Sequence, residues 1–254
     1  MTEINIPFDP NNFHGGPITN PFLPLTPGNS WVYQDVEGGV VTDVVDTVTV
    51  TNQTKVIDGV ECVVVKDVVR EGNKITESTK DYYAQDVAGN VWYFAEDTKT
   101  FQAGGVDRAG TFRGDVDGAA PGIIMLAHPQ IGDRYFEENA PGVAVDQAEV
   151  TSLNQSANVP FGSFQNCLQT RNTSAIIPGD IEFKFYQSGI GSVLETSGDT
   201  RTELVSFTSG GHNSLVQSMA GFGAQGQVGT ASLPQKPEHA QLADIVAPHQ
   251  SHHV

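Results

Sequence analysis

Residues 43–94 read DVVDTVTVTNQTKVIDGVECVVVKDVVREGNKITESTKDYYAQDVAGNVWYF, and this stretch decides the fold. Its first eight residues alternate in part between apolar and polar side chains, as a half-buried strand does. Asp58-Gly59 is a tight-turn signal, and the run 60–69 is apolar enough for a strand that is covered on both faces. Further turn signals follow at Glu71-Gly72-Asn73 and Ala88-Gly89-Asn90. The stretch therefore predicts a meander of adjacent antiparallel strands.

The composition of the whole chain points to the same fold class. The 254 residues include 29 Val against 10 Leu, together with 27 Gly and 14 Pro. Branching at Cβ favours strands, and a chain of this length is typical of one large β domain. We expect an all-β protein whose antiparallel meander closes into a barrel or half-barrel. Calycin-like and lipoprotein-carrier-like shapes both fit the pattern, and a β-sandwich is the alternative.

Composition also divides the chain into three parts. Residues 1–29 are rich in Pro and Asn but carry several Phe and Leu, which predicts an extended N-terminal arm that packs on the domain. Residues 30–207 are predicted to form the β domain. Residues 208–254 are Gly-, Gln- and Ser-rich, contain few charges and carry most of the histidines, which predicts a disordered low-complexity tail.

Charge and the lack of long apolar runs exclude two classes of partner. The chain has 30 acidic and 13 basic side chains, a formal net charge of -17. We therefore expect no nucleic-acid binding, and the sequence has no apolar run of the roughly 18 residues that a membrane helix needs. The acidic residues are spread over strands and turns, so most of them are expected to act as solubilising surface charge. No signal peptide is recognisable at the N-terminus.

The two cysteines, Cys62 and Cys167, leave two interpretations open. They lie about a hundred residues apart, each in an apolar strand-like run. Two buried free thiols and one disulfide across a long loop are both compatible with the sequence.

Several motifs resemble a widespread bacterial family of mostly exported, β-rich proteins for which no activity is established. The resemblance spans about residues 18–206. It is carried by NPFLPLTPGNSWVY from Asn20, DYYAQD from Asp81, GNVWYFAED from Gly89 and GDVDGAAPGIIM from Gly114. It implies an extracellular or periplasmic location, and the cytoplasm is the alternative because no signal peptide is recognisable.

Two aromatic strands are the strongest candidate for a ligand site. Tyr83 and Gln85 share one face of their strand, and Trp92 and Phe94 share a face of the next. Paired across the intervening turn, these four residues could form an aromatic wall that stacks a flat ligand. The alternative is that the rings fill a core or form ordinary cross-strand pairs.

Asp115 and Asp117 are the candidate metal ligands. Alternating carboxylates followed by Gly118 can direct oxygens toward a hard cation such as calcium. A complete EF-hand loop is absent because its twelfth position would be Leu126, and a solvated acidic turn is the alternative. We expect no other cofactor.

These features favour a non-catalytic binding protein for a small apolar or carbohydrate ligand, with calcium as a structural option. One alternative is a barrel-fold enzyme, a cyclase, isomerase or hydrolase, that uses buried carboxylates and Tyr. Another is a secreted acidic surface or matrix protein. The sequence contains no Gly-x-Ser-x-Gly motif and no phosphate-binding loop, so it marks no catalytic residue. It leaves the ligand and the oligomeric state open.

Overall fold

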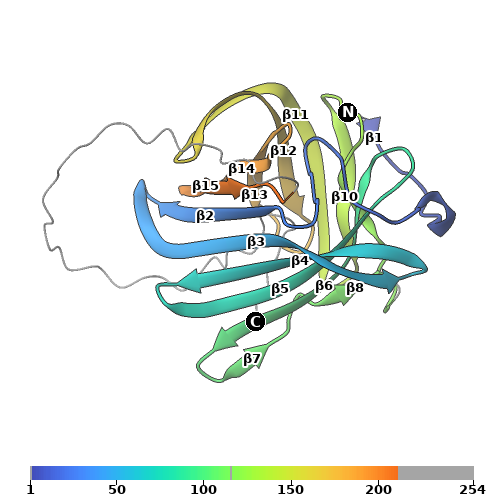
Figure 1. The fold of residues 1–254 in the computed structure, drawn as a ribbon, viewed down its shortest axis with the longest axis horizontal. Coiled ribbons are helices and arrows are strands. Elements are labelled where there is room, and N and C mark those ends of the chain that lie inside the picture. The colour runs from blue at the N-terminus through green and yellow to red at the C-terminus, as the bar shows by residue number, and fades with distance from the viewer. Residues whose placement is uncertain (1, 115, 211–254) are drawn as a thin grey trace, which may run out of the picture.

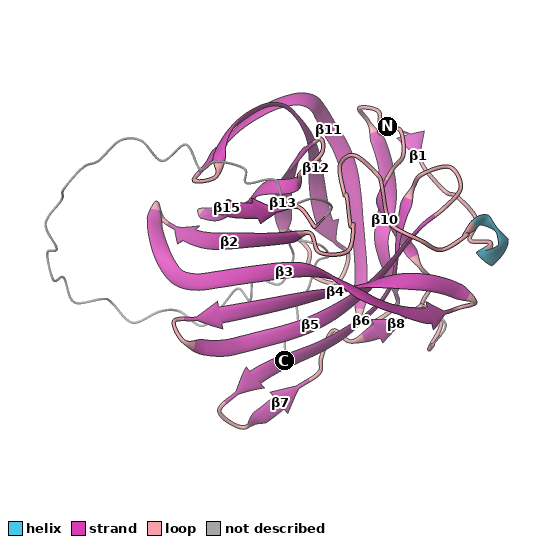
Figure 2. Cartoon of the chain, in the orientation of Figure 1, coloured by secondary structure: helices cyan, strands magenta, loops and turns pink. Residues whose placement is uncertain are grey.

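The computed structural model describes residues 2–114 and 116–210, and nearly all of its regular structure is strand (Figure 2). The N-terminal arm contains β1 (Thr2–Glu3) and one short 3-10 helix (Pro10–Asn12). The next strands are β2 (Ser30–Glu37), β3 (Val40–Ile57), β4 (Val60–Glu71), β5 (Lys74–Gln85), β6 (Val91–Gln102) and β7 (Gly105–Asp107). After them come β8 (Phe112–Arg113), β9 (Gly122–Met125), β10 (Asp133–Ala140), β11 (Ala144–Val159), β12 (Gly162–Ser174), β13 (Ile181–Gln187), β14 (Gly191–Ser197) and β15 (Thr200–Thr208).

Local sequence explains the hairpins of the predicted meander. Between β3 and β4, Asp58 and Gly59 both adopt positive φ angles, 49° and 80°, and Ile57 pairs directly with Val60. Two successive residues with positive φ form the two-residue turn whose twist matches that of paired strands, and Asp-Gly is a favoured sequence for it. The turn predicted at this position is present.

Two antiparallel meanders form one sheet (Figure 1). The first runs from β2 to β7 and the second from β10 to β15, and the pairing of β15 with β2 joins them. One end of the sheet is β1, which pairs in parallel with β10, and the other end is β7. The sheet curls but does not close. The prediction of an all-β barrel or half-barrel with an extended arm is confirmed in its half-barrel form.

The gap between β6 and β10, called the seam below, is partly filled by β8 and β9. Both short strands pair with β6, and Ala120, next to β9, bridges Asn139 of β10. Gly122 of β9 lies directly against the backbone of Glu137, where a Cβ atom would overlap the carbonyl group. Glycine is therefore required for β9 to approach β10 this closely.

The arm packs on the outside of β5 and β6. The rings of Phe8 and Phe13 lie 5.5 to 6.0 Å from those of Trp92 and Phe94. These contacts bury aromatic area that would otherwise face solvent on the convex side of the sheet. No helix among the described residues is long and apolar enough to span a membrane.

The inner face of the sheet has an apolar part and an acidic part. The apolar part contains Trp31, Tyr33, Val48, Val50, Val65, Tyr83, Tyr93, Leu168 and Leu204. The acidic part consists of buried side chains that we call the inner carboxyls, namely Asp35, Asp46, Asp67, Glu77, Asp81, Glu96, Glu137, Glu138, Asp146 and Glu195. These ten of the 30 acidic side chains are buried and therefore do not act as surface charge. Cys62 and Cys167 are buried free thiols.

Candidate functional site

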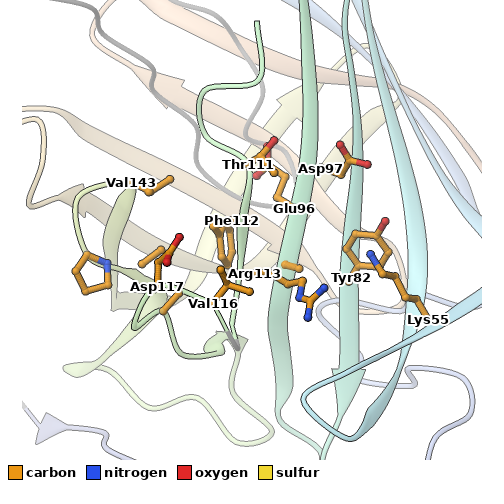
Figure 3. Close-up of a pocket in the computed structure, with 14 residues that line it drawn as sticks. Lys55, Tyr82, Glu96, Asp97, Thr111, Phe112, Arg113, Val116, Asp117 and Val143 are labelled. Carbon is orange, nitrogen blue, oxygen red and sulfur yellow. The ribbon is translucent and has the colours of Figure 1, made fainter.

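A pocket of about 270 Å³ opens at the seam (Figure 3). Segments distant in sequence form it, including β6, β8 and the turn between β10 and β11. Its apolar lining consists of Ala95, Phe112, Val116, Ala119, Ala140, Pro141 and Val143. Its polar lining consists of Lys55, Tyr82, Glu96, Asp97, Thr111, Arg113 and Asp117. A concave apolar surface with a few polar groups is the usual composition of a small-molecule site.

The pocket is built on a rigid aromatic base. Phe112 packs edge-on against Tyr93, with ring centroids 5.2 Å apart, and Tyr93 stacks on Tyr83 at 4.8 Å. On the outer side, the Lys55 ammonium lies 4.5 Å from the centre of the Tyr82 ring, a cation–π contact. Burial raises the pKa of the Tyr82 hydroxyl, as do the nearby Asp97 and Asp81 carboxyls.

Glu96 connects this pocket to the acidic part of the inner face. It lines the pocket, yet its side chain is almost fully buried and accepts a hydrogen bond of 2.9 Å from the Tyr93 hydroxyl. The same hydroxyl lies 2.8 Å from Asp81 Oδ1. Burial raises the pKa of both carboxyls well above the ordinary value, and the charges of neighbouring acids raise it further. Desolvation disfavours the charged form of an acid, so these groups hold protons more tightly.

The inner carboxyls of β3 to β6, Asp46, Asp67, Glu77, Asp81 and Glu96, form what we call the lysine-free wall. Their hydrogen-bond partners include hydroxyl groups and other carboxyls. Glu77 accepts from Thr79 and Thr100, at 3.3 and 3.2 Å. Burial raises the pKa of Asp46 to about 7, and a hydrogen bond from Asp67 lowers it in part. Burial also raises the pKa of Asp67 well above its ordinary value, and the charge of Asp46 raises it further.

The carboxyls of β10 to β14 surround a buried ammonium group, and we call this set the lysine wall: Glu137, Asp146, Glu182 and Glu195 around Lys184. The Lys184 Nζ lies 3.9 Å from a carboxylate oxygen of both Glu182 and Glu195. Lys184 is the one Lys or Arg that is buried within residues 2–114 and 116–210.

The lysine wall also contains carboxyls with raised pKa values, and at two of them the charge of Lys184 limits the rise. Burial raises the pKa of Glu137 to about 7 and that of Asp146 to about 6, and the charge of Lys184 opposes both shifts. Glu137 also accepts a hydrogen bond from Asn172. A register shift between Phe136 and Glu138 accounts for the burial of both Glu137 and Glu138, since a bulge can turn successive side chains to one face.

The predicted aromatic residues do not surround one pocket. Tyr83 lies in the inner face, with its ring stacked on Tyr93. Gln85 holds the arm, because its side-chain oxygen accepts hydrogen bonds from the backbone N–H groups of Thr19 and Asn20 at 2.6 and 3.1 Å.

Trp92 and Phe94 lie on the outer face, where Phe8 and Phe13 of the arm pack on them. The Trp92 indole N–H donates to Asp86 at 2.9 Å. The role of the four predicted aromatic and amide residues in ligand binding stays a prediction.

The structure describes one of the two predicted calcium ligands. Asp115 lies outside the described residues, and Asp117 is exposed at the rim of the pocket with a φ of 54°. Across the described chain, no group of three or more His, Cys, Asp or Glu residues is arranged to hold a metal ion. Calcium binding by Asp115 and Asp117 stays a prediction.

The extent of the acidic inner face is hard to predict from the sequence because each strand contributes only one or two of its carboxyls. On β5, Glu77, Thr79 and Asp81 alternate with Thr76, Ser78 and Lys80, so polar side chains stand on both faces. The available signal was the alternation of acidic residues with Val along β3 and β4, which marks Asp46 and Asp67 as members of the same face as Val48 and Val65.

Comparison with known proteins gives similarity in fold to two solved structures. No protein-family model matches the chain, and no curated protein does. One similar structure is a Bacteroides fragilis protein, proposed to be exported and described with a YmcC-like fold. It is 15% identical, with a TM-score of 0.45, over 74% of this chain and 99% of its own. The other, proposed to be a lipoprotein of Parabacteroides distasonis, is 13% identical, with a TM-score of 0.40, over 74% of this chain and 98% of its own.

Proposed function

We propose that this protein is a non-catalytic binding protein that holds a small, mainly apolar ligand in the seam pocket. The observation that carries the proposal is the pocket of about 270 Å³, whose apolar lining comes from β6, β8 and the β10–β11 turn. Pockets of a few hundred Å³ suit small molecules, and a largely apolar lining supplies affinity while a few polar groups orient the ligand.

Polar side chains in the pocket lining favour a second class of ligand. Thr111, Asp97 and Asp117 can exchange hydrogen bonds with hydroxyl groups of a bound molecule. A monosaccharide combines such hydroxyls with an apolar face, so carbohydrates are the alternative ligand class for the same pocket.

We further propose that the protein acts outside the cytoplasm. This rests on the resemblance of residues 18–206 to a family of mostly exported proteins. Fractionation of the native host, with the protein detected by antibody, is expected to recover it from the periplasm, the outer membrane or the medium. Recovery in the cytoplasmic fraction would contradict this part of the proposal.

Filling the pocket tests the binding function. Phenol, cyclohexanol and glucose serve as probes in ligand-observed NMR, with the wild-type protein and with V143W and V116W, which place an indole in the pocket. We expect phenol or cyclohexanol to bind and both variants to weaken that binding at least tenfold. V40W is the matched control, because Val40 lies outside the pocket lining and is 68% exposed at the start of β3.

The outcomes separate the ligand classes. Binding of glucose alone, lost in both pocket variants, would assign the pocket to carbohydrates instead. Binding of the probes that survives in both V143W and V116W would place the ligand elsewhere and overturn the proposal. Retained binding in V40W, with loss in both pocket variants, supports it.

A further inference from the structure

The hydroxyl of Tyr93 makes two hydrogen bonds that need more than one proton. It lies 2.8 Å from Asp81 and 2.9 Å from Glu96, and β-sheet register places these two acids directly opposite each other on β5 and β6. A phenol has one hydrogen and can donate it to one acceptor. If both carboxyls were ionised, one of these short contacts would join two acceptor oxygens. The arrangement therefore needs a second hydrogen, on Asp81 or on Glu96.

The charged groups that act most strongly on this unit are acidic, and Arg113, which also lines the pocket, is exposed on β8. Asp67 on β4 and Glu77 on β5 act on Asp81, and Glu138 reaches across from β10 to Glu96. Asp46 on β3 lies beside Asp67, and Tyr83 stacks on Tyr93. The Lys side chains next to these positions in sequence, Lys66, Lys80 and Lys99, are not among the buried residues of the inner face.

The neighbouring acids therefore favour the protonated form of this unit. Burial in such surroundings raises the pKa of Asp81 and of Glu96.

We propose that the Asp81–Tyr93–Glu96 unit holds a proton that the folded chain requires, and that it makes the half-barrel a pH-sensitive fold, more stable in acid than above neutral pH. The proton sits between β5 and β6, and β6 forms one side of the seam. Its loss leaves two carboxylates that face each other across one phenol, and their repulsion loosens this part of the sheet. This inference does not depend on a ligand in the pocket.

The sign of the pH dependence follows from proton linkage. Carboxyls of the unfolded chain ionise near pH 4, whereas this unit keeps its proton to higher pH in the folded chain. The stabilisation is complete below the unfolded value and is lost as the pH rises through the folded value. Each unit by which the folded pKa is raised changes the unfolding equilibrium constant tenfold. We expect urea unfolding of the wild-type chain to show at least a tenfold larger unfolding constant at pH 8 than at pH 5.

Two amide variants test the assignment to this unit. In D81N or E96Q, the amide group can donate to the Tyr93 oxygen while the Tyr93 hydrogen goes to the remaining carboxylate. The variant then has the second hydrogen at every pH. We expect the ratio of the unfolding constants at pH 8 and pH 5 to be at least tenfold smaller in each variant than in the wild type. Each variant should also be more stable than the wild type at pH 8. E71Q is the control, because Glu71 is exposed at the end of β4, and it should keep the wild-type pH dependence.

Infrared spectroscopy provides a readout that does not depend on the folding of a variant. A protonated buried carboxyl gives a carbonyl stretch separate from those of carboxylates and amides, and we expect the folded wild type to retain such a band at pH 7. A wild-type stability that is equal or higher at pH 8 than at pH 5 would overturn the proposal. So would a pH dependence that is unchanged in both D81N and E96Q, or a spectrum without the protonated band. Should neither variant fold, the wild-type unfolding and infrared measurements decide.

Discussion

The lysine-free wall and the lysine wall carry buried carboxyls on opposite parts of one inner face, but they neutralise them differently. On β3 to β6, the partners of the acids are hydroxyl groups such as those of Thr79 and Tyr93, and other carboxyls. On β10 to β14, two glutamates lie 3.9 Å from the ammonium group of Lys184. The first wall therefore relies on protons drawn from solution, whereas the second contains its own cation.

This difference predicts opposite responses to pH and to mutation. A carboxyl that is neutralised by a proton loses its partner when the pH rises, because the proton leaves. A carboxylate paired with a buried ammonium keeps its partner over the whole neutral range. Burial lowers the pKa of Lys184, but the charges of Glu195, Glu182 and Glu137 more than offset this and raise it well above its ordinary value. In the lysine wall, the ammonium group of one buried side chain thus takes the neutralising role that protons have in the lysine-free wall.

Removal of the cation from the lysine wall should have the largest effect. K184M leaves the buried Glu195 and the partly buried Glu182 without the ammonium group, and breaking a buried ion pair in this way costs about 3–5 kcal/mol. We expect urea unfolding at pH 7.5 to show this loss. At pH 5 the loss should be smaller, because the glutamates then take up protons, as the lysine-free wall does.

K66M is the matched control for this variant, since Lys66 is exposed on β4. Equal small losses in K184M and K66M would remove the distinction between the two walls.

Removal of the bridging hydroxyl from the lysine-free wall should have an intermediate effect. Y93F deletes the hydroxyl that lies within hydrogen-bond distance of both Asp81 and Glu96, and leaving a buried polar group without its partner costs about 1–3 kcal/mol. We expect a larger loss at pH 8 than at pH 5, because the carboxyls can supply hydrogens of their own in acid.

Y83F is the control for this substitution. Tyr83 is equally buried and stacks on Tyr93, but its hydroxyl has no hydrogen-bond partner among the described residues. We expect Y83F to unfold at the wild-type urea concentration. A loss in Y83F that matches that of Y93F would show that ring packing, and not the shared hydrogen bond, stabilises this wall.

Replacement of one protonated carboxyl by an amide should have the smallest effect and the opposite sign. D67N retains a donor toward Asp46, and the amide group does not ionise. We expect D67N to be more stable than the wild type by about 1 kcal/mol at pH 8, the free energy of about one pKa unit, and equal to it at pH 5. Thermal unfolding at the two pH values measures this. A variant that is less stable at pH 8 would contradict a proton shared between Asp46 and Asp67.

The strands and turns could be predicted from the sequence because their signals are local. The alternation in residues 43–50 and the Asp58-Gly59 turn lie within β3 and the hairpin that follows it. The buried face of β5 could not be predicted, since this strand has polar side chains on both faces and only its pairing with β4 and β6 determines which face is buried.

The candidate site depends on contacts between residues far apart in the chain. The seam pocket requires β8 and the β10–β11 turn to meet β6, and Gln85 finds its partners about 65 residues earlier in the arm. Strand periodicity contains no information on such contacts. The aromatic residues of β5 and β6 were recognised as a group, but the convex and inner faces of the sheet divide them, because Trp92 and Phe94 face the arm and Tyr83 faces the interior.

Glu96 is both a wall of the seam pocket and one of the two acids that share the Tyr93 hydroxyl. A molecule bound in the pocket therefore lies beside a group that exchanges a proton, and the two equilibria form one thermodynamic cycle. In such a cycle the coupling is reciprocal: whatever factor protonation contributes to the affinity for the ligand, the ligand contributes to the affinity for the proton. Calorimetry of ligand binding in buffers of different ionisation enthalpy would then measure how many protons are taken up or released when the ligand binds beside Glu96.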